Sequence, residues 1–381
     1  MRIGFDTSQT AENKAGCGFF AEQLIDHLLQ VDQANQYLLY SVFYNYRHPN
    51  YKNAFQSNQP NVENVFLHHS WREVNKVWDN PEGIEGFLKG PDIVHANNFS
   101  CPKNIQAKKI VTMYDVGFLD CPEYTTEENR LVCFNGAFEA SIYADYIITI
   151  SNFSKESFLK YFPHYPEDRV AVVYLGNRPG LQPLSDSNKN NQILKRLKID
   201  GEYWLAVGTL EPRKNHRLLL KAYAQLVKNR NEKRMLVIAG GSGWMEESIQ
   251  TEVYNLGIGH QTKFMGYVSD EELAALYSSC FAFVYPSFYE GFGLPVLEAM
   301  SCGAPVITSQ VSSLPEVAGE SAIYIDPSSC ESLVEAMKKV EDNNLRTNLK
   351  LTGVQQASKF SWKKVAEEVL KIYEKVAGKD I

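Results

Sequence analysis

The chain has 381 residues, of which 44% are hydrophobic and 22% are charged, and its formal net charge is −7. This length allows two packed domains, and the acidic balance gives no basic footprint for nucleic acid. Residues 1–180 hold 15 Lys and Arg against 21 Asp and Glu, so the N-terminal half offers no general attraction to anionic lipid.

The seven cysteines show no C-x-x-C spacing, which is typical of reduced thiols. The N-terminus leads directly into the apolar segment 3–5, without the cationic and long apolar regions of a signal peptide. No window reaches the length of about 18 apolar residues expected of a membrane span. We therefore expect a cytoplasmic protein with at most peripheral membrane contact.

Short β-branched or aromatic segments alternate with longer amphipathic segments along the chain. The predicted strands are 2–6, 36–43, 92–95, 109–113, 145–150, 170–174, 203–207, 234–239, 281–285, 304–308 and 322–325. The predicted helices include 17–30, 126–143, 214–229, 269–278, 330–340, 345–358 and 361–377. This alternation predicts an α/β protein with parallel sheets that helices cover on both faces.

The alternation breaks once, at residues 176–200, which are rich in Gly, Pro, Ser and Asn. Such a composition is typical of a linker. It divides the chain into two parts, each long enough for a Rossmann-like, doubly wound domain. Two such domains facing each other would leave a cleft at the carboxyl ends of their strands, where ligands of these sheets bind.

Residues 203–216, YWLAVGTLEPRKNH, read as a strand that ends at Gly208, a turn with Pro212, and the start of a helix. Arg213 and Lys214 stand at that helix start. Cations there oppose the helix dipole unless an anion joins them, and a diphosphate is such an anion. The alternative is a solvated basic pair.

Residues 281–308, FAFVYPSFYEGFGLPVLEAMSCGAPVIT, carry the strongest motif. Gly291 and Gly293 precede a helix that opens with Leu294–Pro295, so backbone N–H groups and the helix N-terminus can hold phosphate. Glu290 and Glu298 flank this position, and carboxylates accept hydrogen bonds from sugar hydroxyls. The alternative is that either Glu is a solvated surface charge. The segment predicts a site for a nucleotide sugar.

These two segments, with 264–327 as a whole, resemble the retaining GT-B glycosyltransferases of the large bacterial mannosyl- and glucosyltransferase family. Weaker similarity runs through nearly the whole chain. The E-x7-E signature of that family stands here as Glu290 and Glu298. The resemblance implies a GT-B fold, with two Rossmann-like domains across a cleft. It also implies that the terminal helix carrying Trp362 returns to the first domain, giving an acceptor domain of 1–183 plus 362–381 and a donor domain of 184–361.

The resemblance implies roles for the matching residues. Arg213 and Lys214 would neutralise the departing diphosphate, Glu290 would contact hydroxyls of the transferred sugar, and Glu298 would hold the ribose diol. The backbone of Gly291, Phe292, Gly293 and Leu294 would lie along sugar and phosphate, and Gly266, Tyr267 and Val268 would receive the base. In the first domain, Gly16 and Gly18 match the family's glycine loop under the reaction centre.

Two positions depart from the family. His often follows the strand at 109–113, but Tyr114 stands there, which leaves Tyr114 and Asp115 as candidates for contact with the sugar. Arg commonly follows the glycine matching Gly208, but Thr209 stands there, which shifts diphosphate binding onto Arg213 and Lys214. Asn97 and Asn98 could also reach the cleft, whereas His95 is equally well explained as a satisfied core histidine.

No Asp-x-Asp pair occurs in the sequence, and metal-dependent transferases of the other common fold use such a pair. We therefore expect no cofactor and no metal, with GDP-mannose or a UDP-hexose such as UDP-glucose as donor. The expected acceptor is a saccharide or glycolipid, in polysaccharide biosynthesis. The aromatic stretch 37–55 could bind that acceptor, although Tyr and Phe are more often core residues.

Two alternatives stay open. One is another GT-B enzyme, such as a nucleotide-sugar epimerase. The other is a catalytically silent subunit that binds nucleotide sugar, motivated by Tyr114 and Thr209.

Overall fold

The computed structural model describes residues 1–11, 16–43, 54–69, 86–97, 99, 101–184, 187–230, 232–241, 243 and 246–378. Asn98 and residues 44–53 of the aromatic stretch lie outside this set. The chain divides into two compact units. Unit 1 comprises Met1–Gly176 and Ser361–Ile381, and unit 2 comprises Asn177–Phe360.

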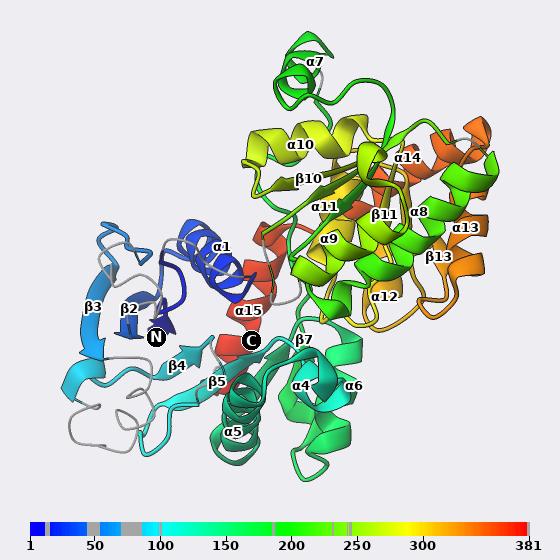
Figure 1. Ribbon diagram of the computed structural model, residues 1–381. Coiled ribbons are helices and arrows are strands. Elements are labelled where there is room, and N and C mark those ends of the chain that lie inside the picture. The colour runs from blue at the N-terminus through cyan, green and yellow to red at the C-terminus, as the bar shows by residue number, and fades with distance from the viewer. Residues whose placement is uncertain are drawn as a thin grey trace. The chain divides into compact units, whose positions relative to one another are not determined.

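Unit 1 is built on a seven-stranded sheet in the order β3-β2-β1-β4-β5-β6-β7, in which every pairing is parallel. Its strands are β1 (Arg2–Asp6), β2 (Gln36–Phe43), β3 (Val62–His69), β4 (Ile93–Ala96), β5 (Lys108–Met113), β6 (Tyr146–Thr149) and β7 (Val170–Val172). Its helices are α1 (Gly16–Val31), α4 (Gly117–Asp120), α5 (Glu127–Tyr143), α6 (Asn152–Tyr161) and α15 (Trp362–Val376). Helices α1 and α15 lie side by side (Figure 1).

Unit 2 has a six-stranded parallel sheet in the order β10-β9-β8-β11-β12-β13. Its strands are β8 (Tyr203–Val207), β9 (Met235–Ala239), β10 (Thr262–Gly266), β11 (Ala282–Tyr285), β12 (Val306–Ser309) and β13 (Ala322–Ile325). Its helices are α7 (Ser187–Arg196), α8 (His216–Arg230), α9 (Glu246–Asn255), α10 (Asp270–Ser279), α11 (Leu294–Ser301), α12 (Leu314–Ala318), α13 (Cys330–Lys339) and α14 (Asn343–Ala357).

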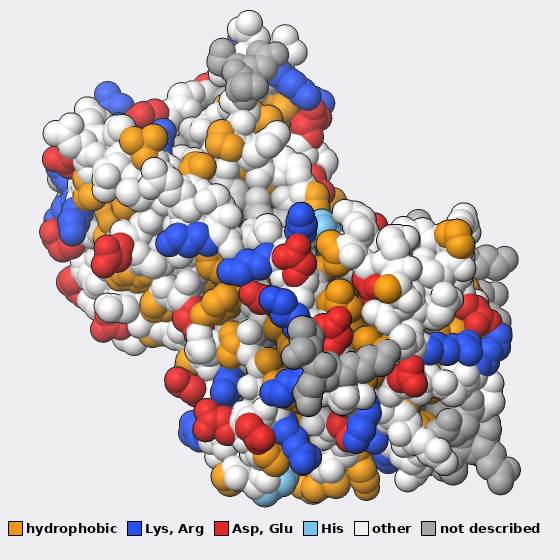
Figure 2. All heavy atoms as spheres, turned by 180° about the vertical axis from the view of Figure 1, so that it is seen from behind, with side chains coloured by type: hydrophobic (Ala, Val, Ile, Leu, Met, Phe, Trp, Pro, Cys, Tyr) orange, Lys and Arg blue, Asp and Glu red, His pale blue; other side chains and the backbone are white. Residues whose placement is uncertain are grey.

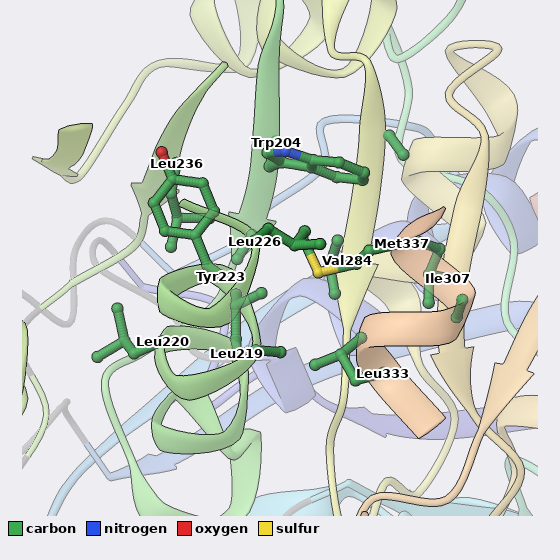
Figure 3. Close-up of a cluster of buried hydrophobic side chains, with 14 of the residues drawn as sticks. Trp204, Leu219, Leu220, Tyr223, Leu226, Leu236, Val284, Ile307, Leu333 and Met337 are labelled. Atoms are coloured by element: carbon green, nitrogen blue, oxygen red, sulfur yellow. The ribbon is translucent and has the colours of Figure 1, made fainter. Parts of the chain in front are cut away.

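The core of unit 2 lies where α8 and α13 cover one face of the sheet. Trp204 on β8, Tyr223 on α8 and Met337 on α13 are essentially buried, and the close-up in Figure 3 shows them with their apolar neighbours. Because crossovers between parallel strands are right-handed, helices lie on opposite faces where the strands progress in opposite directions across the sheet. The strands progress from β8 to β10 in one direction, with α8 and α9 between them, and from β11 to β13 in the other, with α11 after β11. Helices α8 and α9 therefore cover one face, and α11 covers the other.

The predicted parallel α/β architecture is confirmed, but the linker prediction at 176–200 is wrong in part. Helix α7 forms inside that segment, because Ile193 is buried and the helix packs against α10. Asn188 and Asn191, which contributed to the linker prediction, are exposed on this helix, whereas Asn190 is buried. Strand β3 was also missed, since it shows no continuous apolar run.

The surface matches the mixed composition of the sequence. Figure 2 shows Lys and Arg side chains interspersed with Asp and Glu on one face. In the described part of the chain, no helix is both long and apolar enough to cross a membrane.

Candidate active site

The carboxyl edge of the unit 2 sheet brings the predicted donor residues together. The strand order reverses between β8 and β11, which pair directly with each other. Ligands of open α/β sheets bind at such a switch point, outside the carboxyl ends of the strands. The segment after β8 carries Gly208 to Lys214, and the segment after β11 carries Glu290 to Gly293.

Three glycine turns line this edge. The Gly208 N–H donates to the Ala239 carbonyl at 2.9 Å, and the Gly240 N–H donates to the Gly266 carbonyl at 2.8 Å. A Cβ atom on Gly240 would stand 2.0 Å from the Gly208 oxygen, so only glycine fits there. The turns after β8, β9 and β10 therefore form one connected backbone rim. Thr209 lies exposed on it.

Arg213 and Lys214 occupy a single 3₁₀ turn, Pro212–Lys214, directly before α8. Asn215 adopts a left-handed conformation after this turn, with φ of 56°. Its amide donates to the carbonyls of Pro286 at 3.1 Å and Pro327 at 2.8 Å. These bonds tie the cationic turn to the loops that follow β11 and β13, so both cations are held at the edge of the sheet.

Glu290 receives both cations. Arg213 Nη1 lies 2.6 Å from its Oε2, and Lys214 Nζ lies 2.7 Å from its Oε1. The Glu290 backbone is fixed as well, because its N–H donates to Ser312 Oγ at 3.0 Å and its carbonyl accepts from Ser313 Oγ at 2.8 Å. The two segments that the sequence placed in one pocket, 76 or 77 residues apart, are thus in direct contact.

Burial and charge act in opposite directions on this cluster. Glu290 is only 6% exposed, and burial alone would raise the pKa of its carboxyl. The neighbouring Arg213 and Lys214 outweigh burial and hold that pKa at about 2. Burial and the adjacent Arg213 lower the pKa of Lys214. Glu290 is therefore a stably ionised group, suited to accept hydrogen bonds from hydroxyls.

Two residues of this cluster were not predicted from the sequence. Glu211 Oε1 lies 2.6 Å from Arg213 Nη2, so the two cations face two carboxylates. Tyr285, at the end of β11, accepts a hydrogen bond of 2.5 Å from Lys214 Nζ. Neither residue belongs to a motif, and only the folded arrangement shows their part. An anionic ligand here must share the cations with Glu290 and Glu211.

The backbone from Gly291 to Leu294 leads into α11 as predicted. Gly293 caps the helix with φ of 104°, a conformation that favours glycine, and a Cβ atom there would meet Leu314 at 2.8 Å. The Phe292 ring is buried against Phe360, with ring centroids 5.9 Å apart. This leaves the backbone N–H groups and the positive end of the helix as the features suited to an anion.

Glu298 lies in α11 and is 2% exposed. Tyr277 on α10 donates its hydroxyl to Glu298 Oε2 at 3.2 Å, and Arg178 Nε stands 2.9 Å from Oε1. Arg178 is a further residue that sequence analysis missed, because it lies in the segment read as a linker.

The third predicted segment, Gly266–Val268, follows β10 at the outer edge of the sheet. Gly266 has φ of 64°, and Tyr267 is 87% exposed. An aromatic ring this exposed is suited to stack on a planar ligand.

In unit 1, Gly16 and Gly18 form the first turn of α1. Tyr114 lies beside them at the end of β5, but it is only 9% exposed. Its hydroxyl is directed at the carbonyls of Asn97, at 2.8 Å, and Cys17, at 3.2 Å. Asp115 is half-buried, and its Oδ1 accepts from the Gly117 N–H at 2.8 Å. Through its contact with the Cys17 carbonyl, Tyr114 supports the first turn of α1.

His95 is a satisfied core residue. Its Nδ1 lies 2.6 Å from the Tyr373 hydroxyl, and its Nε2 lies 2.8 Å from Thr112 Oγ1. Thr112 in turn donates to Asn97 Oδ1 at 3.1 Å. Burial lowers the pKa of His95 to about 3, so the ring is neutral. Asn97 is also buried and donates to the Asp6 carbonyl at 3.1 Å. In the aromatic stretch, Tyr37 and Tyr40 are core residues.

Among the residues that the structure describes, no three His, Cys, Asp or Glu side chains are grouped so that they could share a metal ion.

Comparisons with known proteins identify the family. Residues 188–356 match the model "Glycosyl transferases group 1". The chain is 34% identical over 284 residues to the Escherichia coli O-antigen chain mannosyltransferase B, covering 74% of each chain. It is 30% identical over 293 residues to the serotype-specific mannosyltransferase WbdA of Escherichia coli, matching 72% of this chain and only 36% of that relative.

The solved structure of Anabaena HepE in complex with UDP-glucose superposes with a TM-score of 0.75 at 16% identity, over 98% of this chain and 100% of that one. This likeness confirms the predicted GT-B fold, and the relatives confirm the prediction of a hexosyltransferase. With a mannosyltransferase relative matched over three quarters of both chains, this protein belongs to the group 1 glycosyltransferases.

Proposed function

We propose that the protein transfers a hexose from a nucleoside diphosphate sugar to a hydroxyl of a saccharide or glycolipid acceptor, in polysaccharide assembly. GDP-mannose is the preferred candidate donor, because the relatives are named O-antigen mannosyltransferases. A UDP-hexose such as UDP-glucose is the second candidate, and a structural neighbour binds UDP-glucose. The observation that carries the proposal is the contact of Arg213 and Lys214 with Glu290, beside the N-terminus of α11.

In this proposal the diphosphate lies between the cationic turn and the first turn of α11. Arg213, Lys214 and the backbone N–H groups stabilise the negative charge that grows as the diphosphate leaves. This supply of positive charge is what supports transfer without a metal ion. Glu290 stays ionised and accepts hydrogen bonds from the sugar, and Glu298 accepts them from the ribose.

Transfer proceeds with retention of configuration. The bond between the anomeric carbon and the diphosphate oxygen breaks through an oxocarbenium-like state. The acceptor oxygen then bonds to the anomeric carbon on the same face, and its proton passes to the departing phosphate oxygen. Glu290 is not a nucleophile here, because its contacts with two cations stabilise the carboxylate and reduce its reactivity. The protein contributes position and electrostatic stabilisation.

The test incubates the protein with GDP-mannose or UDP-glucose and a mannose-terminated oligosaccharide, with and without EDTA. We expect an elongated product from one donor, an anomeric configuration equal to that of the donor by NMR, and an unchanged rate in EDTA. An epimerised nucleotide sugar without transfer would contradict the proposal, as would an inverted product. A rate abolished by EDTA would contradict metal independence alone.

A further inference from the structure

Arg178 is the second residue of unit 2 and lies outside the two motif segments 203–216 and 281–308, yet it contacts the buried Glu298 of the candidate site. Its Nε stands 2.9 Å from Glu298 Oε1, and its Nη1 donates to Asp270 Oδ1 at 3.0 Å. The Arg178 side chain is 29% exposed, whereas that of Glu298 is 3% exposed. The guanidinium therefore lies between a buried carboxylate and a solvent-exposed one at the start of α10.

Glu298 has little other compensation for its burial. The titratable or charged groups that face it from neighbouring elements of the described structure are Arg178, Tyr277 and Asp270, with Cys302 at the end of α11. Arg178 is the cation of this set. Burial raises the pKa of Glu298, and the charge of Arg178 opposes that rise.

We propose that Arg178 is the positioning residue that keeps Glu298 ionised and oriented, and thereby gives the donor site its preference for a ribonucleoside diphosphate over its 2′-deoxy analogue. The inference rests on the proposed function of this site. A carboxylate accepts hydrogen bonds from both hydroxyls of a ribose, whereas a protonated carboxyl uses one oxygen as a donor. Arg178 is itself held by its hydrogen bond to Asp270, and this places its charge 2.9 Å from Oε1 of Glu298, while Tyr277 donates to Oε2.

The experiment compares wild type, R178Q and R178K by calorimetric titration with GDP and 2′-deoxy-GDP, and with UDP and 2′-deoxy-UDP, at pH 6 and pH 8. For wild type we expect a preference for the ribonucleotide of about 10-fold, the value of one or two hydrogen bonds, and little change with pH. For R178Q we expect the preference to fall to about 2-fold, chiefly through weaker ribonucleotide binding, and to fall further at pH 6. R178K should keep part of the preference at both pH values.

The matched control is R196Q. Arg196 forms an exposed ion pair with Glu272 of α10 at 3.2 Å, and it lies outside the donor cluster, so its loss should leave both affinities unchanged. If circular dichroism shows that R178Q is unfolded, the proposal is tested with R178K instead. Because R178K keeps the positive charge, we expect its preference for the ribonucleotide to lie between about 2-fold and about 10-fold and not to depend on pH.

A wild type that binds none of the four nucleotides would refute the proposed function of the site. A wild type that binds and discriminates, together with an R178Q that shows the full wild-type preference at both pH values, would overturn the role of Arg178 and leave the proposed function standing. If R178Q is unfolded, an R178K with the full wild-type preference, or with a preference that falls at pH 6, would overturn it.

Discussion

In both sheets of this protein the first four strands in chain order are arranged as third, second, first and fourth, but the side chains at the carboxyl edges of the two sheets differ. In unit 2 the switch point between β8 and β11 holds paired charges, Arg213 and Lys214 against Glu290 and Glu211. In unit 1 the corresponding point between β1 and β4 holds a neutral network through His95, Thr112 and Asn97, beside the buried carboxylate of Asp6, which accepts hydrogen bonds from Ser8. The same scaffold thus presents carboxylates paired with two cations in one unit, and mainly neutral hydrogen-bonding groups in the other.

The difference is instructive because burial has opposite consequences in the two regions. A buried charge is tolerated only when it is paired, and pairs of this kind are retained at sites that bind charged ligands. A neutral network satisfies its own donors and acceptors and mainly fixes the backbone. We therefore expect substitutions in unit 2 to change catalysis and ligand binding, and substitutions in the unit 1 network to change stability.

The largest effect is expected from Lys214→Ala. This change removes a cation that the proposal places on the leaving diphosphate, and the loss of one such preorganised group lowers kcat by about 10²- to 10³-fold. Steady-state transfer assays with saturating donor measure it. Lys221→Ala, an exposed lysine on the next turns of α8, is the control and should keep wild-type kcat. A Lys214→Ala enzyme with nearly full activity would mean that the charge cluster is structural.

Glu290→Gln is expected to alter the pH dependence of stability. The pKa of Glu290 in the folded protein, about 2, lies below the ordinary value of 4.5, so its stabilisation is present above pH 4.5 and is lost as pH falls towards 2. The wild type should lose on the order of 3 kcal/mol more than Glu290→Gln over this window. Thermal unfolding between pH 7 and pH 3 measures the part of this difference that falls above pH 3, about 2 kcal/mol. Parallel curves for the two proteins would show that Glu290 is not held by its cations.

Tyr373→Phe tests the structural role of the neutral network in unit 1. The substitution leaves the buried His95 Nδ1 without its hydroxyl partner, which is expected to lower the free energy of unfolding by about 1–3 kcal/mol. Donor affinity and kcat should change less than about 2-fold, since the network is neutral. Tyr254→Phe, at a position that is 83% exposed, is the control for both measurements. A selective loss of kcat with unchanged stability would contradict the structural role.

Tyr114→Phe tests whether the Tyr114 hydroxyl supports the backbone of unit 1 or contacts the transferred sugar. If the hydroxyl only holds the carbonyls of Asn97 and Cys17, its loss should lower the free energy of unfolding by about 1 kcal/mol and kcat by less than about 5-fold. Chemical unfolding and transfer assays on the same preparation measure the two quantities. A 100-fold fall in kcat at unchanged stability would instead assign Tyr114 to the sugar, the role that the family's His at this position suggested.

Glu211→Gln is expected to have the smallest effect, and in the opposite direction. It removes one of the two carboxylates that compete with a diphosphate for Arg213. We expect binding of the nucleoside diphosphate to tighten by about 2- to 5-fold, in line with the modest energy of a partly exposed ion pair. Calorimetric titration measures this change, and weaker binding would show that Glu211 positions Arg213 more than it competes for it.

Much of the fold could be predicted from the sequence because parallel strands that are buried on both faces leave continuous apolar runs, as at 203–207 and 322–325. Strand β3 was missed because polar residues such as Glu63 and Asn64 interrupt its apolar residues. Helix α7 was missed because its composition is that of a loop, and its burial depends on α10, which lies far along the chain.

Some residues of the candidate site could be predicted from the sequence, and others could not. The motif and the resemblance pointed to Glu290, Arg213 and Lys214, which lie in turns that contain Gly or Pro, and to Glu298 in α11 through its E-x7-E spacing from Glu290. Glu211, Tyr285 and Arg178 could not be found in this way. Their importance comes from pairings with residues 71 to 120 positions away or from a turn geometry that the local sequence does not encode.

The position of the diphosphate is best determined by a crystal structure of the protein with bound GDP or UDP, whichever of the two binds. We predict that the phosphate oxygens lie within hydrogen-bonding distance of Arg213 or Lys214 and of the backbone N–H groups between Gly291 and Leu294. A diphosphate that binds elsewhere, with the Glu290 cluster unchanged and unoccupied, would contradict the account.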